Sequence, residues 1–290
     1  MTDPDRVALP RGRFLELSHA PLVMAIVNCT PDSFYAKSRA STSDTAIERS
    51  LAAEASGAAI IDLGGESTRP GAAYVEAEEE IDRILPVVEG IRKRSGVPIS
   101  VDTRKTAVAR AALEAGADII NDISALEDDD ELGPLCAAAG AAVVLMHKKG
   151  TPDSMQTSPF YNDVVAEVRD YLEGAVRRAE GYGIARAGII IDPGIGFGKR
   201  FEDNFDILAG LAEIGRSGYP ILIGLSRKGF IGTITGKVIE ERLAGTLAAN
   251  AAAIAGGAKI LRVHDVAETF DLIRVFSAIT LRNVARKGIS

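Results

Sequence analysis

The side chains that could do chemistry in this 290-residue chain gather at one kind of position, directly after a short apolar run. Eight such runs occur along the chain, and polar or charged residues follow each of them. These residues are Asn28, Asp62, Asp102, Asn121, Asp122, His147, Asp192, Ser226, Arg227, Lys228, Arg262 and His264. A single polar residue after a strand usually caps the next helix, but capping alone does not explain eight clusters of varied type.

Three of these residues form a group of short, acceptor-rich side chains. Asp102, Asn121 and Asp192 suit a flat heterocycle that presents several N–H donors along one edge. Two other interpretations stay open. The two acids could transfer protons, or the group could bind a divalent metal, although no tight acidic motif clusters the ligands. We interpret His147 as a core or capping residue, and Asp62 and Asp122 as acceptors of backbone N–H groups in loops.

A second group is basic and lies beside glycine-rich stretches at 64–65 and 194–199. It consists of Arg69, Lys228, Arg262 and His264. Backbone amides together with Arg and Lys predict an anion site, most plausibly for phosphate. The glycine spacing fits neither a dinucleotide fingerprint nor an NTPase phosphate loop, and no nucleophile elbow is present. A heterocycle held deep in the fold with an anion at its mouth favours group transfer with diphosphate leaving.

The elements that must position these residues alternate regularly. The apolar runs are continuous and β-branched, as in strands buried on both faces of a parallel sheet. Between them, positions such as Val164, Val168, Leu172 and Val176 follow helical spacing. We therefore expect an α/β fold, a single (β/α)8 TIM barrel with its site at the carboxyl ends of the strands, with a doubly wound sheet as the main alternative. Residues 1–20 are expected to be an N-terminal edge segment that could cover the bottom of the barrel, and 21–290 the barrel domain.

Composition narrows the class of protein. The chain has 33 Lys and Arg against 40 Asp and Glu, and 47% of its residues are hydrophobic, as in ordinary globular proteins. The net charge of −7 argues against a nucleic-acid-binding protein. No apolar run is long enough to cross a membrane, and no secretory signal is recognisable. We expect a cytoplasmic protein in which Cys29 and Cys136 are reduced thiols.

The motifs at the ends of the apolar runs resemble those of the dihydropteroate synthases, a pterin-binding family, from about residue 21 to 285. The matching stretches are MAIVNCTPDSF (24–34), GGESTRPGA (64–72), VDTRK (101–105), NDISAL (121–126), LMHKKGTPDSMQ (145–156), DPGIGFGK (192–199), GLSRKGFIG (224–232) and RVHDV (262–266). Each is moderately specific. Their occurrence in this order, after successive predicted strands, is very specific.

The resemblance implies a fold, a reaction and a metal. Members of the family are (β/α)8 barrels and usually homodimers. They are transferases that join 6-hydroxymethyl-7,8-dihydropterin diphosphate to 4-aminobenzoate, giving 7,8-dihydropteroate and diphosphate in folate biosynthesis, with Mg²⁺ beside the diphosphate. The reaction is thought to ionise first, after which the neutral aromatic amine attacks. Such an amine requires no strong base, so positioning and charge stabilisation are the needed contributions.

The resemblance also implies roles for individual residues. It implies a pterin pocket of Asp102, Asn121, Asp192 and Lys228, with Asn28 as the Mg²⁺ ligand. It implies diphosphate contacts from Arg262 and His264, loop closure by Phe34 and Arg69, and an aminobenzoate wall of Thr68, Phe197 and Ser226. Met146 and Gly224 complete the expected substrate-binding set. The expected catalytic residues are Asp32, Arg69, Asp102 and Lys228.

The chain also departs from the family pattern. The first loop reads Ser-Phe-Tyr-Ala-Lys-Ser at 33–38 where the family usually has Ser-Phe-Ser-Asp-Gly-Gly, and Gly229 stands where a Ser is usual. Lys148 and Lys149 replace a common Met-Arg or Met-Gln pair. These changes concern aminobenzoate handling more than pterin binding. They motivate one alternative, a pterin-binding paralogue with weak or no activity; a methyltetrahydrofolate:corrinoid methyltransferase is the other.

Overall fold

Eight parallel strands form a nearly closed barrel, which confirms the predicted fold class. A computed structural model describes residues 5–17, 20–29, 38–66, 74–150 and 159–287. The strands are β3 (Leu22–Asn28), β4 (Ile60–Gly64), β5 (Ile99–Asp102), β6 (Ile119–Asp122), β7 (Ala142–Met146), β8 (Ile189–Asp192), β9 (Leu222–Ile223) and β10 (Ile260–Val263). Their order is β8-β7-β6-β5-β4-β3-β10-β9, and a parallel bridge between Ile191 and Ile221 brings the two ends together.

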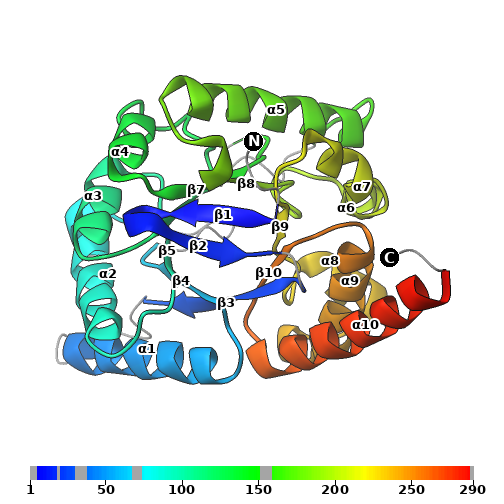
Figure 1. Ribbon diagram of the computed structural model, residues 1–290, viewed down its shortest axis with the longest axis horizontal. Coiled ribbons are helices and arrows are strands. Elements are labelled where there is room, and N and C mark those ends of the chain that lie inside the picture. The colour runs from blue at the N-terminus through cyan, green and yellow to red at the C-terminus, as the bar shows by residue number, and fades with distance from the viewer. Residues whose placement is uncertain (1–4, 18–19, 30–37, 67–73, 151–158, 288–290) are drawn as a thin grey trace.

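Helices surround the barrel (Figure 1). They are α1 (Ser38–Ala55), α2 (Ala77–Arg92), α3 (Thr106–Glu114), α4 (Leu132–Ala139), α5 (Val164–Gly181), α6 (Phe201–Ala209), α7 (Leu211–Ile214), α8 (Gly229–Thr235), α9 (Leu243–Ala255) and α10 (Val266–Lys287). In α5 the predicted apolar stripe is buried, and the Asp163 side chain caps the helix by accepting a hydrogen bond from the Ala166 N–H. Within the described ranges, no helix is both long enough and apolar enough to cross a bilayer.

A β-hairpin covers the amino-terminal end of the barrel. Its strands, β1 (Arg6–Leu9) and β2 (Arg13–Glu16), pair in antiparallel register and lie across the middle of the ring of helices in Figure 1. Apolar residues of the hairpin, Val7 and Leu15 among them, pack in one cluster with barrel-lining residues such as Met24, Ile119 and Ile190. This alternating hairpin face closes the end of the barrel opposite the strand tips.

A buried ion cluster fastens the same end. Asp118, whose side chain is fully buried, precedes β6. Its carboxylate pairs with Arg11 at 2.6 Å, Arg13 at 3.0 Å and Arg92 at 2.5 Å, and it also accepts a hydrogen bond from the Ile99 N–H at 3.1 Å. Four donors on one carboxylate compensate the loss of its water shell. The cluster therefore ties the hairpin to the barrel wall.

Candidate active site

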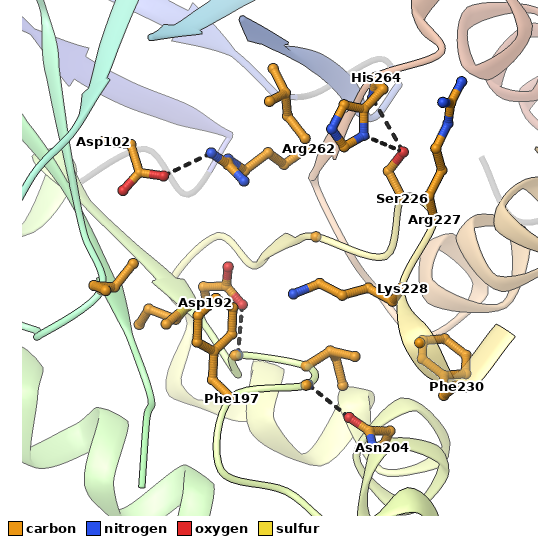
Figure 2. A pocket seen from close by; sticks show the side chains of 18 of the residues that line it. Asp102, Asp192, Phe197, Asn204, Ser226, Arg227, Lys228, Phe230, Arg262 and His264 are labelled. Atoms are coloured by element: carbon orange, nitrogen blue, oxygen red, sulfur yellow. Dashed lines mark hydrogen bonds and ion pairs between the residues drawn. The ribbon is translucent and has the colours of Figure 1, made fainter. Parts of the chain in front are cut away.

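The carboxyl ends of the strands surround a cavity of about 820 Å³. Every predicted site residue in the described part of the chain lines it: Asn28, Asp102, Asn121, Met146, Asp192, Phe197, Gly224, Ser226, Lys228, Arg262 and His264. Figure 2 shows how several of these side chains point toward one another. Asp32, Phe34, Thr68 and Arg69 lie outside the described residues. Strand-end residues from opposite sides of the barrel thus form one site, as the parallel topology requires.

The floor of the cavity is an ion network around Arg262 on β10. Its Nε lies 2.6 Å from Asp62 Oδ2 on β4, and a terminal nitrogen lies 2.8 Å from Asp102 Oδ2 on β5. Asp62 also accepts hydrogen bonds from the Ser100 hydroxyl at 2.6 Å and the Asn121 amide at 3.4 Å. The interpretation of Asp62 as a backbone acceptor in a loop is therefore wrong, because its partners are side chains of neighbouring strands that face the barrel interior.

The pKa values of Asp102 and Arg262 on the cavity floor differ from those of exposed groups. Burial raises the pKa of Asp102 to about 7, although the neighbouring Arg262 opposes the shift. Burial alone would lower the pKa of Arg262, but Asp62 and Asp102 raise it overall, so the guanidinium stays charged. Two nitrogens of the Arg262 guanidinium thus contact carboxylates. The expected contact of Arg262 with a diphosphate stays a prediction.

On the side of the cavity formed by the ends of β8 and β9, Lys228 faces Asp192 and Phe197 (Figure 2). Asp192 Oδ1 accepts a hydrogen bond from the Gly194 N–H at 2.7 Å, and the Lys228 ammonium lies 4.3 Å from the centre of the Phe197 ring. Burial lowers the pKa of Lys228 to about 8 and raises that of Asp192. The ammonium of Lys228, the carboxylate of Asp192 and the aromatic ring of Phe197 surround one space, and this combination suits a flat polar heterocycle.

The turn that carries Phe197 can be built only from glycine at two positions. Gly194 and Gly198 have φ of +67° and +63°. A Cβ on Gly194 would lie 1.9 Å from the His147 carbonyl oxygen, and one on Gly198 would lie 2.1 Å from that of Lys149. The turn after β8 therefore packs directly against the backbone that follows β7, which fixes this wall of the cavity.

The turns after β9 and β10 are joined at the cavity mouth. Ser226 Oγ lies 2.9 Å from His264 Nδ1 and accepts a hydrogen bond from the His264 N–H at 3.2 Å. Arg227 has φ of +57°, a strained value for a residue with a Cβ, and its guanidinium pairs with Asp265 through two contacts of 2.6 and 3.1 Å. The strained turn directs Arg227 away from its neighbour Lys228, whose ammonium extends toward Asp192 (Figure 2).

Sequence reasoning missed several residues that line the cavity. They are Ile26, Glu66, Ile123, Phe201, Asn204, Phe230, Ile239, Glu240 and Arg242. Lys199 and Arg227 also line it, but no site role was predicted for either. The adjoining glycine-rich turn was a usable signal for Lys199. No local signal marked Arg242, because it reaches the cavity only through the fold of the segment between α8 and α9.

Two other polar residues at or just after strand ends, His147 and Asp122, make structural contacts. His147 is buried, packs edge-on against the Tyr171 ring, and has its pKa lowered to about 2 by burial and by Lys199. Asp122 accepts hydrogen bonds from the Ser124 N–H and the Leu126 N–H at 2.7 and 2.6 Å. Both residues hold loops in place from outside the cavity.

The described side chains could supply only part of the coordination of a divalent metal ion. Within the described ranges, no three His, Cys, Asp or Glu side chains are grouped closely enough to hold a metal ion. Asn28, at the end of β3, brings an amide side chain to the cavity. Mg²⁺ is commonly held by one or two protein oxygens together with substrate phosphates and water. The site thus fits a Mg²⁺ ion that arrives with a phosphorylated substrate.

Comparisons with known proteins agree with this geometry. Residues 24–264 match the family described as pterin binding enzyme. The chain is 47% identical to the dihydropteroate synthase of Escherichia coli K12 over 270 residues, covering 92% of this chain and 94% of the relative.

Solved structures are similar over nearly the whole chain. The dihydropteroate synthase of Xanthomonas albilineans with 4-aminobenzoic acid superposes with a TM-score of 0.88 at 43% identity, covering 97% of this chain and 99% of that one. A structure of the enzyme from that organism in complex with 7,8-dihydropteroate gives a TM-score of 0.84 at 40% identity, covering 95% and 98%.

Proposed function

Because this chain belongs to the dihydropteroate synthase family of pterin-binding enzymes, which acts in folate biosynthesis, we propose how its own residues carry out the reaction. The substrates are 6-hydroxymethyl-7,8-dihydropterin diphosphate and 4-aminobenzoate, and the products are 7,8-dihydropteroate and diphosphate. The observation that carries the proposal is the meeting of Asp192, Asn121 and Lys228 in one cavity. These residues come from three separate strand ends and together supply acceptors and a cation for one flat ring.

The pterin ring lies on the cavity floor in this proposal. Asp102, Asn121 and Asp192 accept hydrogen bonds from its N–H groups, and the Lys228 ammonium donates to a ring acceptor. The bond between the methylene carbon and the diphosphate oxygen breaks, and the electron pair leaves with the diphosphate. The buried carboxylates stabilise the resulting pterin cation, because charges interact strongly where water is excluded.

The 4-aminobenzoate then attacks from the mouth of the cavity. Its neutral amine forms the new C–N bond and afterwards loses a proton to water or diphosphate. Phe197 and Ser226 form one wall of its pocket in this proposal. Thr68 and Arg69, with Asp32 and Phe34, are proposed to complete the site from the two loops outside the described residues.

We propose that Asn28 holds Mg²⁺ together with the substrate diphosphate. The ion would supply positive charge to the leaving group. Arg262 and His264 are proposed to contact the diphosphate, the first through the guanidinium nitrogen that makes neither contact with Asp62 nor with Asp102. Replacing Asn28 with Ala should raise the Mg²⁺ concentration needed for half-maximal activity, measured by diphosphate release.

A homodimer and a cytoplasmic location complete the proposal. Val275 and Ile279, one turn apart on α10, are 61% and 59% exposed, which supports a subunit contact on this helix. The buried free thiols Cys29 and Cys136 support a reducing compartment. Light scattering of the purified chain, with a Val275→Asp variant as the comparison, tests the dimer: the wild type should have twice the mass of the variant.

A turnover assay with both substrates tests the proposed function. Diphosphate release should require both 4-aminobenzoate and Mg²⁺, and 7,8-dihydropteroate should appear in equal amount. Calorimetric binding of the pterin substrate without product would instead identify the paralogue that binds pterin without catalysis. The space beside Gly229, where a Cβ would meet no atom within 4 Å, is the feature that favours this alternative. Methyl transfer from methyltetrahydrofolate would identify the corrinoid-dependent alternative.

A further inference from the structure

Lys199 is a buried lysine at the cavity wall whose contacts serve the backbone. It ends the glycine-rich turn after β8, and only 3% of its surface is exposed. Its ammonium donates hydrogen bonds to the carbonyl oxygens of Gly194 at 2.8 Å and Phe197 at 3.1 Å. The ammonium also lies 2.8 Å from His147 Nδ1 and 3.4 Å from the His147 carbonyl oxygen. Three ammonium hydrogens thus meet four acceptors, which leaves none for a substrate.

These contacts connect Lys199 to the two side chains that face Lys228. The carbonyl of Gly194 binds the Lys199 ammonium, while the N–H of the same residue donates to Asp192 Oδ1 at 2.7 Å. The Phe197 carbonyl oxygen accepts a hydrogen bond from Lys199. The centre of the Phe197 ring lies 4.3 Å from the Lys228 ammonium. A displacement of Lys199 would therefore move both Asp192 and Phe197.

Charge gives Lys199 a second effect on the same carboxylate. The charged groups around Asp192 are Lys199, Lys228 and Arg262, and each lowers its pKa against the effect of burial. Around Lys199 itself, burial and Lys228 lower the pKa to about 7, while Asp192 and Asp203 oppose this. The His147 ring has its pKa lowered to about 2 and therefore stays neutral, so its Nδ1 accepts a hydrogen bond from the Lys199 ammonium.

We infer that Lys199 is a positioning residue of the active site: from beneath the cavity wall it orients Asp192 and Phe197 and keeps the Asp192 carboxylate ionised for ligand binding. It touches no reacting atom in this inference. Its ammonium acts on the substrate only through Asp192, which receives both a geometric and an electrostatic contribution. The inference rests on the proposed function, because the ligand that Asp192 binds is taken to be the pterin.

The test compares pterin binding by wild type and Lys199→Met between pH 6 and pH 8.5. The probe is 6-hydroxymethyl-7,8-dihydropterin diphosphate, and calorimetry gives its Kd. At pH 8.5 the variant should bind roughly tenfold more weakly, since the turn loses its anchor. Toward pH 6 the deficit should grow to roughly a hundredfold, because Asp192 without the nearby cation takes up a proton at higher pH.

A second variant separates geometry from charge. Lys199→Arg keeps the positive charge, but its planar guanidinium cannot reproduce the contacts of an ammonium. It should bind the pterin substrate more weakly than wild type by a factor that stays the same from pH 6 to pH 8.5. If Lys199→Met does not fold, the inference is judged on this variant: wild-type affinity, or a deficit that grows in acid, would overturn it.

A matched control removes a lysine of the adjacent loop. Lys148 pairs with Asp128 at 3.0 Å and does not line the cavity, so Lys148→Met should bind the pterin substrate as wild type does. Binding by Lys199→Met within twofold of wild type, or a loss equal at every pH, would overturn the inference. Absence of pterin binding by the wild-type chain would instead refute the proposed function, and the two failures are therefore distinguishable.

Discussion

Both ends of the barrel bury a carboxylate beside arginine, but they use it differently. At the amino-terminal end, Asp118 receives three guanidinium groups and a backbone N–H. At the carboxyl end, Asp102 receives one guanidinium, which it shares with Asp62. Among the described residues, Asp102 Oδ1 accepts no hydrogen bond. One carboxylate is saturated by the protein, whereas the other keeps an oxygen available.

The difference separates stability from binding. A saturated buried ion cluster has its desolvation compensated within the chain, so its loss should weaken the fold and leave the ligand unaffected. A buried polar group with spare bonding capacity costs folding free energy until a ligand supplies the missing partner. The raised pKa of Asp102 and the lowered pKa of Lys228 are consistent with that cost. Substitutions at Asp118, Lys228, Asp102 and Arg227 would test this division.

The largest expected effect is on stability. Asp118→Asn should lower the free energy of unfolding by about 3 kcal/mol, because three arginines lose their common counter-ion. Chemical denaturation measures the change. The Kd for the pterin substrate should stay within twofold of wild type below the unfolding transition. A large loss of pterin affinity in the folded variant would contradict the division between the two ends.

The next effect is on binding. Lys228→Ala should weaken pterin binding about a hundredfold, equivalent to about 2.7 kcal/mol, because a charged contact disappears from a desolvated site. Calorimetry gives the affinity, and the melting temperature serves as the control. That temperature should not fall, since in the described part of the chain the Lys228 ammonium donates no hydrogen bond that would be lost. Pterin affinity like that of wild type would remove Lys228 from the site.

A third prediction concerns the proton on Asp102. Its pKa is raised from 3.8 to about 7, so between these values the folded chain binds a proton that the unfolded chain lacks. Its contribution to the free energy of unfolding therefore falls as the pH rises from about 4 to about 7, and is constant above. A ligand that donates N–H groups to the carboxylate favours its ionised form. Pterin binding at pH 6.5 should release a proton.

Calorimetry in buffers of different ionisation enthalpy measures this release. In Asp102→Asn the released fraction should disappear, and the stability profile between pH 4 and pH 7 should become flatter. Equal proton release by the variant and the wild type would assign the titrating group elsewhere.

The smallest effect should come from the ion pair at the cavity mouth. Arg227 and Asp265 are partly exposed, so their coupling in a double-mutant cycle of stability should be about 1 kcal/mol. Arg227→Gly removes the pair but also relieves the strained backbone at φ +57°, so it should be more stable than Arg227→Ala. Thermal unfolding of the two variants checks the order, and the reverse order would argue against strain at this residue.

The barrel and most of the cavity could be predicted because the signals are local. The strands are short, continuous and apolar, and six of the eight carry a polar residue at their last position or directly after it, as β5 does at Asp102 and β8 at Asp192. Parallel topology alone then brings these ends together, whatever their separation along the chain. The family motifs suggested roles for these positions and added others, such as Phe197 and Gly224, that the pattern of polar residues had not marked.

Other features could not be predicted, because they depend on long-range packing. The partners of Asp62 come from β5, β6 and β10, and nothing near Asp62 in the sequence announces them. The amino-terminal segment was expected at the edge, as a possible cover for the bottom of the barrel, but its pairing into a hairpin was not predicted. Apolar residues at every second position, Val7 and Leu9 and then Leu15 and Leu17, were a signal for the paired strands. The signal is weak because each strand has only four residues.

The glycines of the turn after β8 have a consequence for how this site can change. No side chain can be introduced at Gly194 or Gly198 without displacing a neighbouring carbonyl, so substitutions at these two positions should disrupt the turn. Gly224 and Gly229 also line the cavity, and a Cβ there would meet no atom within 4 Å. Changes in ligand preference are therefore expected from substitutions at Gly224 and Gly229 on the β9 side, and not from substitutions at Gly194 and Gly198 on the β8 side.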